Sequence, residues 1–178
     1  MVVKGNQNVQ AVNQMVSGRE PVIYLSGTTS AQVQGVNPLA WALTSNVELA
    51  TGRLLSSSDT GAAVIGDRLA NSTFKLPVTL GRKITINGRP FTVIGILKPS
   101  LSGVGGGGDS SAYVTYQDAW DVTDINRDTF SSLQVKVYDK GQVDETVLGL
   151  TANLLMSRKV TERTQDFSIT SAQAIKEQ

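Results

Sequence analysis

The sequence predicts an α+β fold in which a β-rich segment is inserted into a split βαβ unit. Three patterns support this fold class. A helix pattern followed by a strand pattern opens the chain, a β-hairpin pattern occupies its middle, and a strand–helix–strand pattern closes it. A chain of 178 residues suits one domain, or two small subdomains that share a core.

The hairpin is the clearest local pattern in the chain. Apolar residues alternate with polar ones over residues 83–86 and again over residues 91–97, and Asn87-Gly88 joins the two runs. Asn-Gly suits a type I′ turn, which needs positive φ at both central residues. Gly95, inside the second run, predicts a β-bulge or a close backbone approach.

The first region predicts a helix and then a strand. Asn6 or Asn8 is a plausible N-cap, and Gly18 is placed as a C-terminal stop. One apolar face of this helix would be formed by Val9, Val12, Met15 and Val16. Residues 21–25 (PVIYL) then predict a strand.

The last region predicts a strand, a helix and a second strand. Apolar and polar residues alternate over residues 132–138, which predicts a strand. Residues 143–157 carry one apolar face, with Asp144 and Glu145 in the first turn as the helix dipole favours. Residues 167–170 predict the closing strand.

These regions predict the domain organisation. Residues 1–30 and 129–178 form the predicted discontinuous α+β subdomain. Residues 31–128, with many short β-segments and turns, form the predicted inserted β-rich subdomain.

Composition excludes several function classes. Sixteen Lys and Arg against fifteen Asp and Glu leave a net charge of +1 with no basic stripe, which argues against nucleic-acid binding. The absence of histidine and cysteine excludes Ser-His-Asp and Cys-His catalysis, tetrahedral zinc sites and iron–sulfur sites. No phosphate-binding P-loop motif occurs, and no apolar run approaches the ~18 residues that span a bilayer.

Several short motifs follow one another in a characteristic order. They are VQGVNP at 33–38, LATGR at 49–53, AAVIG at 62–66, the hairpin TLGRKITINGRPFTVIGIL at 79–97, and AYVTY at 112–116. Together they cover about residues 31–118 and resemble the MacB-like extracytoplasmic (periplasmic core) domains of ABC-transporter permease subunits, of the FtsX, LolE and MacB type. Thr115 stands where that family usually has a proline.

The resemblance implies a fold, a location and partners. It implies a porter-like βαβ subdomain with an inserted β-rich subdomain, although only residues 1–4 remain for the strand that usually precedes the first helix. The domain would lie on the periplasmic or cell-surface side, membrane-anchored in the full-length protein. The implied partners are flanking transmembrane helices of the same full-length protein, a separate ATP-binding subunit or domain, a second permease copy (a dimer), and an extracytoplasmic adaptor or cargo. Residues near Asn6 and Gln178 should then lie at the same end of the fold.

Ser72-Thr73-Phe74-Lys75 matches the S-x-x-K motif of serine acyltransferases. On a helix, this spacing would let Lys75 assist deprotonation of Ser72. The companion S-D-N and K-T-G motifs are missing, and the segment also suits the polar end of a short helix before Pro77. A chance match is therefore favoured.

The sequence contains three further motifs of this kind. Asp118, Asp121, Asp124 and Asp128 recur at helical spacing and could bind a hard cation, although carboxylates that begin a helix and then face solvent are favoured. Residues 103–108 satisfy G-x-G-x-x-G, but a strand-like run follows them, which favours a loop over a dinucleotide site. Asn71-Ser72-Thr73 is a glycosylation-type triplet of a kind common by chance.

Two function classes remain open. One is a non-catalytic extracytoplasmic domain of an ABC-transporter permease, which contacts cargo or a partner protein and/or relays ATP-driven motion across the membrane (mechanotransmission). The other is a small serine-dependent hydrolase that uses Ser72 and Lys75. The motif order and the lack of histidine favour the first. We therefore expect no enzyme activity, and no catalytic, cofactor-binding or metal-binding residues.

Overall fold

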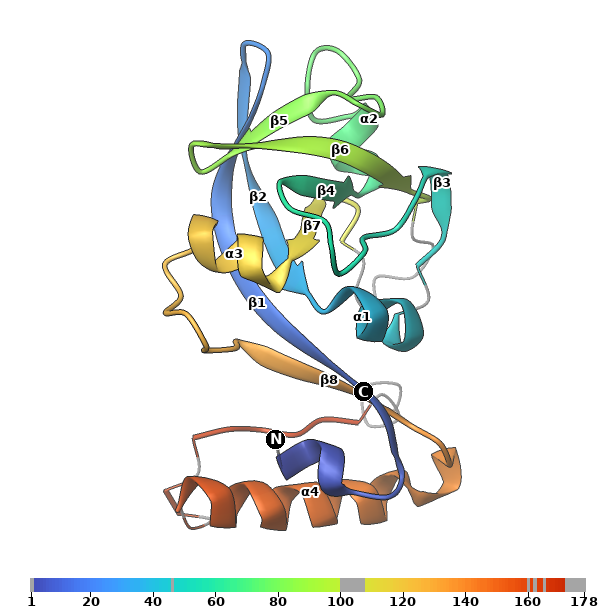
Figure 1. Ribbon diagram of the computed structural model, residues 1–178, viewed down its shortest axis with the longest axis vertical. Coiled ribbons are helices and arrows are strands. Elements are labelled where there is room, and N and C mark those ends of the chain that lie inside the picture. The colour runs from blue at the N-terminus through green and yellow to red at the C-terminus, as the bar shows by residue number, and fades with distance from the viewer. Residues whose placement is uncertain are drawn as a thin grey trace. The chain divides into compact units, whose positions relative to one another are not determined.

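The computed structural model describes residues 2–45, 47–99, 108–159, 161, 163–164 and 166–171. The fold is mixed α/β, with a large sheet and few helices (Figure 1). The chain divides into two compact units. Unit 1 comprises Met1–Val12 and Val135–Gln178, and unit 2 comprises Asn13–Gln134. Two strands, β1 (Val9–Tyr24) and β8 (Ser132–Val137), cross the boundary between the units.

Unit 2 contains most of the sheet. Its other strands are β2 (Gly27–Val36), β3 (Leu49–Gly52), β4 (Ala62–Ile65), β5 (Lys83–Ile86), β6 (Arg89–Leu97) and β7 (Ser111–Thr115). The sheet order is β2-β7-β4-β6-β5-β1-β8, with β3 paired to β6. Because β1 also pairs with β2, the strands from β2 to β1 close into a ring, which leaves few unpaired strand edges.

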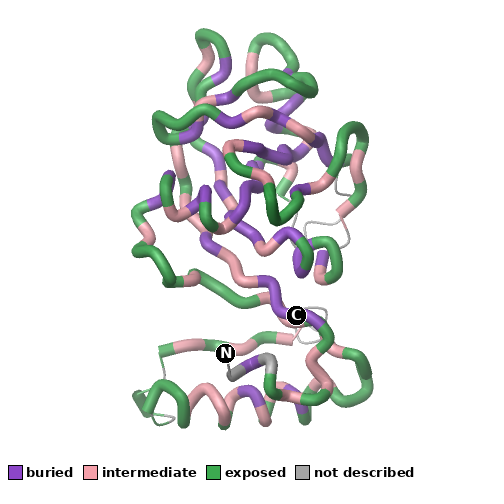
Figure 2. The backbone as a smooth tube through the Cα atoms, in the orientation of Figure 1, coloured by how far each residue is buried: buried purple, intermediate pink, exposed green. Residues whose placement is uncertain are grey.

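Alternation along β7 explains how the core of unit 2 is built. Ala112 and Val114 face one buried cluster, whereas Tyr113 between them faces a second cluster and stacks on Trp41 with ring centroids 4.8 Å apart. Trp41 belongs to α1 (Pro38–Thr44), which covers this second face. Burial of the Tyr113 hydroxyl raises its pKa to about 12. Both faces of β7 are therefore covered. Figure 2 shows that buried residues lie along the strands of unit 2.

The helix predicted from Asn6 or Asn8 to Gly18 is wrong. The segment is the first part of β1, a single strand of 16 residues that pairs with β2 from Val16↔Gly35 to Tyr24↔Gly27. Valines at spacings of three and four satisfy a helical face, but β-branched residues also favour strands. Pairing with a distant strand decided the outcome. The strand predicted at 167–170 is also wrong, since residues 166–171 form no strand.

The hairpin prediction is confirmed. β5 and β6 pair from Lys83↔Thr92 to Ile86↔Arg89, and the two turn residues have positive φ, 44° at Asn87 and 83° at Gly88. The predicted irregularity at Gly95 is also present. The ladder between β4 and β6 shifts register before Gly95, and a Cβ on this residue would lie 2.3 Å from the carbonyl oxygen of Arg53.

Unit 1 is smaller. It contains α4 (Val143–Arg158), which confirms the predicted helix, and two short 3₁₀ turns, Val2–Gly5 and Lys140–Gln142. The buried core of the unit consists of Val3, Val12 and Leu150. Asn8, predicted as a helix cap, instead bonds Thr146 Oγ1 of α4 at 2.8 Å and accepts the backbone N–H of Asp139 at 2.9 Å. Asn8 thus joins the start of β1 to α4.

The domain boundaries predicted from sequence remain a prediction. Residues 13–30 were expected to group with the chain ends, whereas the compact units place them in unit 2. Asn6 and the last described residue, Ser171, both belong to unit 1. Gln178 lies outside the described residues.

Candidate functional site

The turn between β1 and β2 presents an apolar side chain to solvent. Tyr24 pairs with Gly27, so Leu25 and Ser26 alone form the turn. Leu25 has a φ of 53° and is 67% exposed. A non-glycine residue in the left-handed region costs roughly 1–2 kcal/mol, and glycine or asparagine usually occupies such turn positions. Neither its backbone conformation nor its exposure favours leucine here.

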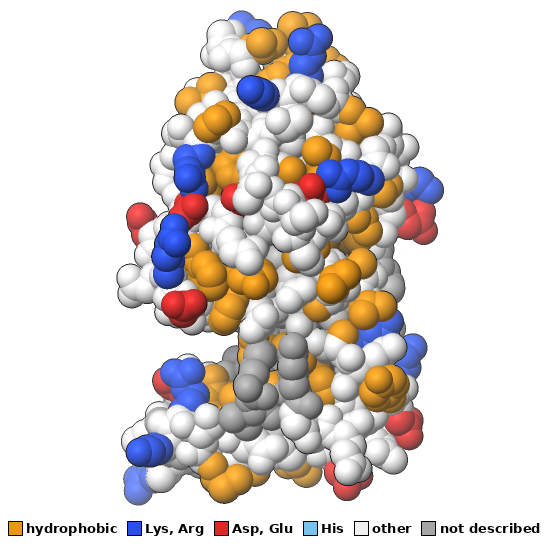
Figure 3. Space-filling view, in the orientation of Figure 1, with side chains coloured by type: hydrophobic (Ala, Val, Ile, Leu, Met, Phe, Trp, Pro, Cys, Tyr) orange, Lys and Arg blue, Asp and Glu red, His pale blue; other side chains and the backbone are white. Residues whose placement is uncertain are grey.

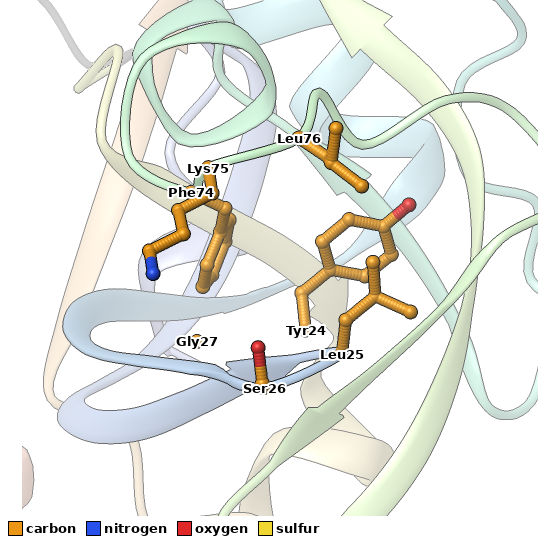
Figure 4. Close-up of a pocket in the computed structure, with 7 residues that line it drawn as sticks. All are labelled: Tyr24, Leu25, Ser26, Gly27, Phe74, Lys75 and Leu76. Carbon is orange, nitrogen blue, oxygen red and sulfur yellow. The ribbon is translucent and has the colours of Figure 1, made fainter.

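A hollow of about 390 Å³ lies beside this turn (Figure 4). Residues 24–27 line it from the hairpin, and residues 74–76 line it from the segment that follows α2 (Asp67–Asn71). The rings of Tyr24 and Phe74 meet edge to face, with centroids 5.6 Å apart. Gly27 allows this packing, since a Cβ there would lie 3.0 Å from the Phe74 ring. The walls of the hollow are therefore largely apolar and aromatic.

Two polar groups belong to the same hollow. Figure 4 shows the Lys75 ammonium group beside the Phe74 ring, and the Ser26 hydroxyl directed between the hairpin and the segment after α2. Among the described residues, neither Lys75 nor the Ser26 side chain has an ion-pair or hydrogen-bond partner. The hollow thus combines apolar walls with one cation and one hydroxyl that are available to a ligand.

The structure does not assemble the serine hydrolase site considered in the sequence. Helix α2 ends at Asn71, so Ser72 is its C-cap and Lys75 lies beyond it, outside the helical geometry that S-x-x-K catalysis requires. Lys75 lines the hollow, Ser72 does not, and no hydrogen bond joins the two described residues. Lys75 was predicted from the sequence as the partner of Ser72 in the S-x-x-K motif. Leu25 and Ser26 were not predicted as site residues. The Ser-Gly pair at 26–27 is the turn signal that could have found them.

The four aspartates do not converge on a cation site. Asp118 is buried rather than facing solvent, and its Oδ2 accepts the backbone N–H of Gly61 at 3.0 Å. Asp121 pairs with Arg89 and Arg127, and the hydrogen bond from Arg89 contributes most to holding its pKa below the usual range. In the part of the chain that the structure describes, no three acidic side chains cluster as metal ligands would.

Two other sequence motifs are only partly visible. The glycine-rich motif falls mainly on residues 103–107, which lie outside the described residues. A strand, β7, follows it from Ser111, as predicted, where a dinucleotide site would need a helix. Asn71, of the glycosylation-type triplet, is exposed, and its side-chain amide donates to Asp67 Oδ1 at 2.8 Å.

A buried polar network lies at the other end of unit 2. Asn13 of β1 is fully buried, and its Oδ1 accepts the backbone N–H of Asn37, the N-cap of α1, at 3.0 Å. The Asn13 amide donates to Gln134 Oε1 of β8 at 3.3 Å. The same oxygen accepts the hydroxyls of Thr44 at 3.1 Å and Ser45 at 3.4 Å, at the end of α1. Both ends of α1 are thus tied to the strands that lead into unit 1.

Comparisons with known proteins identify the fold and the family. The periplasmic region of MacB from Actinobacillus actinomycetemcomitans superposes with a TM-score of 0.77 at 20% identity, over 98% of this chain and 78% of that one. The extracellular domain of the noncanonic ABC-type transporter YknZ from Gram-positive bacteria gives a TM-score of 0.74 at 20% identity, over 90% and 82%. No curated protein sequence matches at a significant level.

The family model for the MacB-like periplasmic core domain matches residues 2–152, most of the chain. This match extends beyond residues 31–118, where the sequence motifs were recognised, at both ends. The chain therefore belongs to the family of MacB-like periplasmic core domains, the extracytoplasmic domains of ABC-transporter permeases, as its motifs predicted.

Proposed function

We propose that this chain is a non-catalytic extracytoplasmic domain of an ABC-transporter permease that contacts a partner protein or cargo and relays ATP-driven motion across the membrane. The family match over residues 2–152 carries the proposal. The hydrolase alternative has no support, because Ser72 and Lys75 are not assembled into a site.

The connection between the two units supports a role in relaying motion. Both links between the units are strands, β1 and β8, which are paired with each other. Where these strands enter unit 2, Asn13 and Gln134 bond one another and the ends of α1. A displacement of the chain ends would therefore reach the core of unit 2 through hydrogen-bonded strands rather than through a flexible linker.

The proposal includes partners and a location. Transmembrane helices of the same protein would flank the domain, and a separate ATP-binding subunit or domain would supply the energy. A second permease copy and an extracytoplasmic adaptor or cargo complete the proposed assembly, with the domain on the periplasmic or cell-surface side. Within the described residues, no helix has the length and apolar character needed to cross a bilayer.

The proposal also keeps the domain organisation expected from the sequence. The porter-like subdomain would comprise residues 1–30 and 129–178, with β8 and α4 as a strand and a helix of its split βαβ pattern, and residues 31–128 would be the β-rich insertion. The described strand and helix at 132–158 support this arrangement, although β1 replaces the expected first helix.

A deletion in the full-length permease tests the proposed function. Residues 13–134 are replaced by Asn-Gly, which joins Val12 to Val135 as a hairpin. The hydrogen bond from the Tyr138 N–H to the Asn8 carbonyl, at 2.9 Å, shows that these two strand segments already lie side by side in unit 1. We expect the variant to assemble with its ATP-binding subunit and to hydrolyse ATP, but to lose transport.

The control is the intact permease paired with an ATP-binding subunit that cannot hydrolyse ATP, which should also fail to transport. Transport at the normal rate by the deletion variant would contradict the proposed function.

A further inference from the structure

We propose that the tip of unit 2 binds an extended protein segment in which an acidic side chain neighbours a large apolar one. The binding surface, called the tip surface here, consists of Leu25, Ser26, Phe74, Lys75 and Leu76 around the hollow. This proposal rests on the proposed function, because it gives the chemistry of the extracytoplasmic partner that the domain contacts.

The first observation is that the residue at the turn, Leu25, is unfavourable for folding but suitable for binding a partner. Leu25 is 67% exposed and adopts a left-handed backbone conformation, so glycine or asparagine would fit this position with less strain. Leu76, on the opposite side of the hollow, is 60% exposed. Residues held in unfavourable backbone conformations cluster at binding sites, where the surrounding structure maintains them. Two exposed leucines facing one hollow supply an apolar anchor for a partner.

The second observation is the shape of the surface. The hollow, of about 390 Å³, lies at the lower end of the roughly 300–1,000 Å³ found for ligand pockets. Tyr24 and Phe74 form its aromatic walls, and the Tyr24 hydroxyl is occupied by the Pro77 carbonyl at 3.4 Å. The Tyr24 hydroxyl is therefore directed toward Pro77. An aromatic hollow of this size suits one large apolar side chain of a partner.

The third observation is the sign of the charge. Residues 21–30, around the β1–β2 turn, and residues 72–88 contain no Asp or Glu. Lys75 lines the hollow, and continuing the register Val22↔Ile86 and Ile23↔Thr85 places Lys83 level with Leu25. Neither lysine has an ion-pair partner among the described residues.

Figure 3 shows Lys and Arg side chains among apolar ones at the end of the molecule where the β1–β2 turn lies, with no acidic side chain there on this face. A segment with a carboxylate beside its apolar anchor complements this charge.

The shape of the tip surface favours a protein over a bilayer. Roughly 35 Å of extended strand separates Asn13 from Tyr24 along β1, so the tip and Asn13 lie at opposite ends of unit 2. A concave site suits one inserted side chain better than a flat lipid surface does.

A random twelve-residue peptide library, displayed on phage and selected on the 178-residue chain, tests the proposal. We expect enrichment of peptides that carry Asp or Glu next to Leu, Ile, Phe or Trp. The synthesised consensus peptide should bind at least tenfold more weakly to Leu25→Asn and to Lys75→Glu. Lys75→Glu should in addition select peptides in which Lys or Arg replaces the acidic residue.

Matched controls separate binding from folding. Leu148→Gln changes an equally exposed leucine on α4, 72% exposed, and Lys140→Glu changes an exposed lysine of unit 1; both should bind the peptide as wild type does. Leu25→Asn should be as stable as wild type or more stable, since asparagine tolerates positive φ. Thermal unfolding of each variant verifies that it is folded.

Several results would overturn the proposal. One is the absence of an acidic–apolar consensus, and another is a consensus peptide that binds both tip variants as tightly as wild type. A third is binding to vesicles with 30% phosphatidylglycerol that Leu25→Asn abolishes, without peptide enrichment, since it would assign the tip to a lipid surface. The peptide selection requires neither ATP nor the membrane. A failed peptide selection would therefore leave the transport result of the deletion variant unaffected.

Discussion

At the scale of single residues, glycines mark where two backbones come closest in unit 2. Gly52, in β3, has a φ of 85°, and a Cβ there would lie 2.3 Å from the carbonyl oxygen of Ile94. Gly95, in β6, faces the carbonyl of Arg53 at the same separation. Strands β3 and β6 pair antiparallel here, with Gly52 opposite Gly95, and neither of these two positions has room for a Cβ. Gly52 of the 49–53 motif and Gly95 of the hairpin motif thus allow the same close contact between β3 and β6.

Gly95→Val should therefore destabilise unit 2 by about 1–3 kcal/mol, because the added side chain meets backbone that cannot rotate away. The measurement is the midpoint of denaturant unfolding. Gly5→Val is the matched control, since a Cβ at Gly5 meets no atom within 4 Å. Equal unfolding midpoints for wild type and Gly95→Val would show that this close approach does not constrain the fold.

At the scale of elements, α1 is held by side chains that lie far from it in sequence. Gln134 Oε1 is the shared acceptor of Asn13, Thr44 and Ser45, which lie on β1 and at the end of α1. The Asn13 side chain is fully buried, so its amide has no access to water as an alternative partner. The network joins β1, β8 and α1 to one another within unit 2.

Gln134→Leu should cost about 1–3 kcal/mol, because it leaves the buried Asn13 amide without an acceptor. Gln134→Glu keeps an oxygen acceptor for all three donors and should cost less. Thermal unfolding compares the stability of the two variants. In the full-length permease, Gln134→Leu should also reduce the amount of transport per ATP hydrolysed. If both substitutions lowered the melting temperature equally, the shared acceptor would not be the stabilising feature.

At the scale of the whole molecule, the two units differ in how much core they bury. The buried cluster described for unit 1 consists of Val3, Val12 and Leu150, whereas the main cluster of unit 2 runs through β1, β2 and the strands from β4 to β7. Apolar burial dominates stability, so unit 1 should open locally at a lower free energy than unit 2.

Hydrogen exchange of the 178-residue chain measures this difference. We expect backbone amides of α4 to exchange at least about 100-fold faster than those of β4 and β7 at the same pH, because they are released by local opening of unit 1. Amides near the β1–β2 turn serve as an internal reference for exposed positions. Equal protection of α4, β4 and β7 would mean that the two units unfold together.

The sequence by itself determined the features that depend on neighbouring residues. The Asn87-Gly88 turn, the irregularity at Gly95 and the helix that begins at Val143 all follow from local backbone preferences, which act over a few residues. The family could also be recognised, because its motifs are short local patterns in a fixed order.

Only the tertiary structure decided the features that join distant residues. The valines of residues 9–16 suit a helix or a strand equally, and pairing with β2 selected the strand. The tip hollow joins residues 24–27 to residues 74–76, and the Asn13–Gln134 bond spans 121 positions. No local preference encodes such contacts, because they form only when the folding of the whole chain brings the segments together.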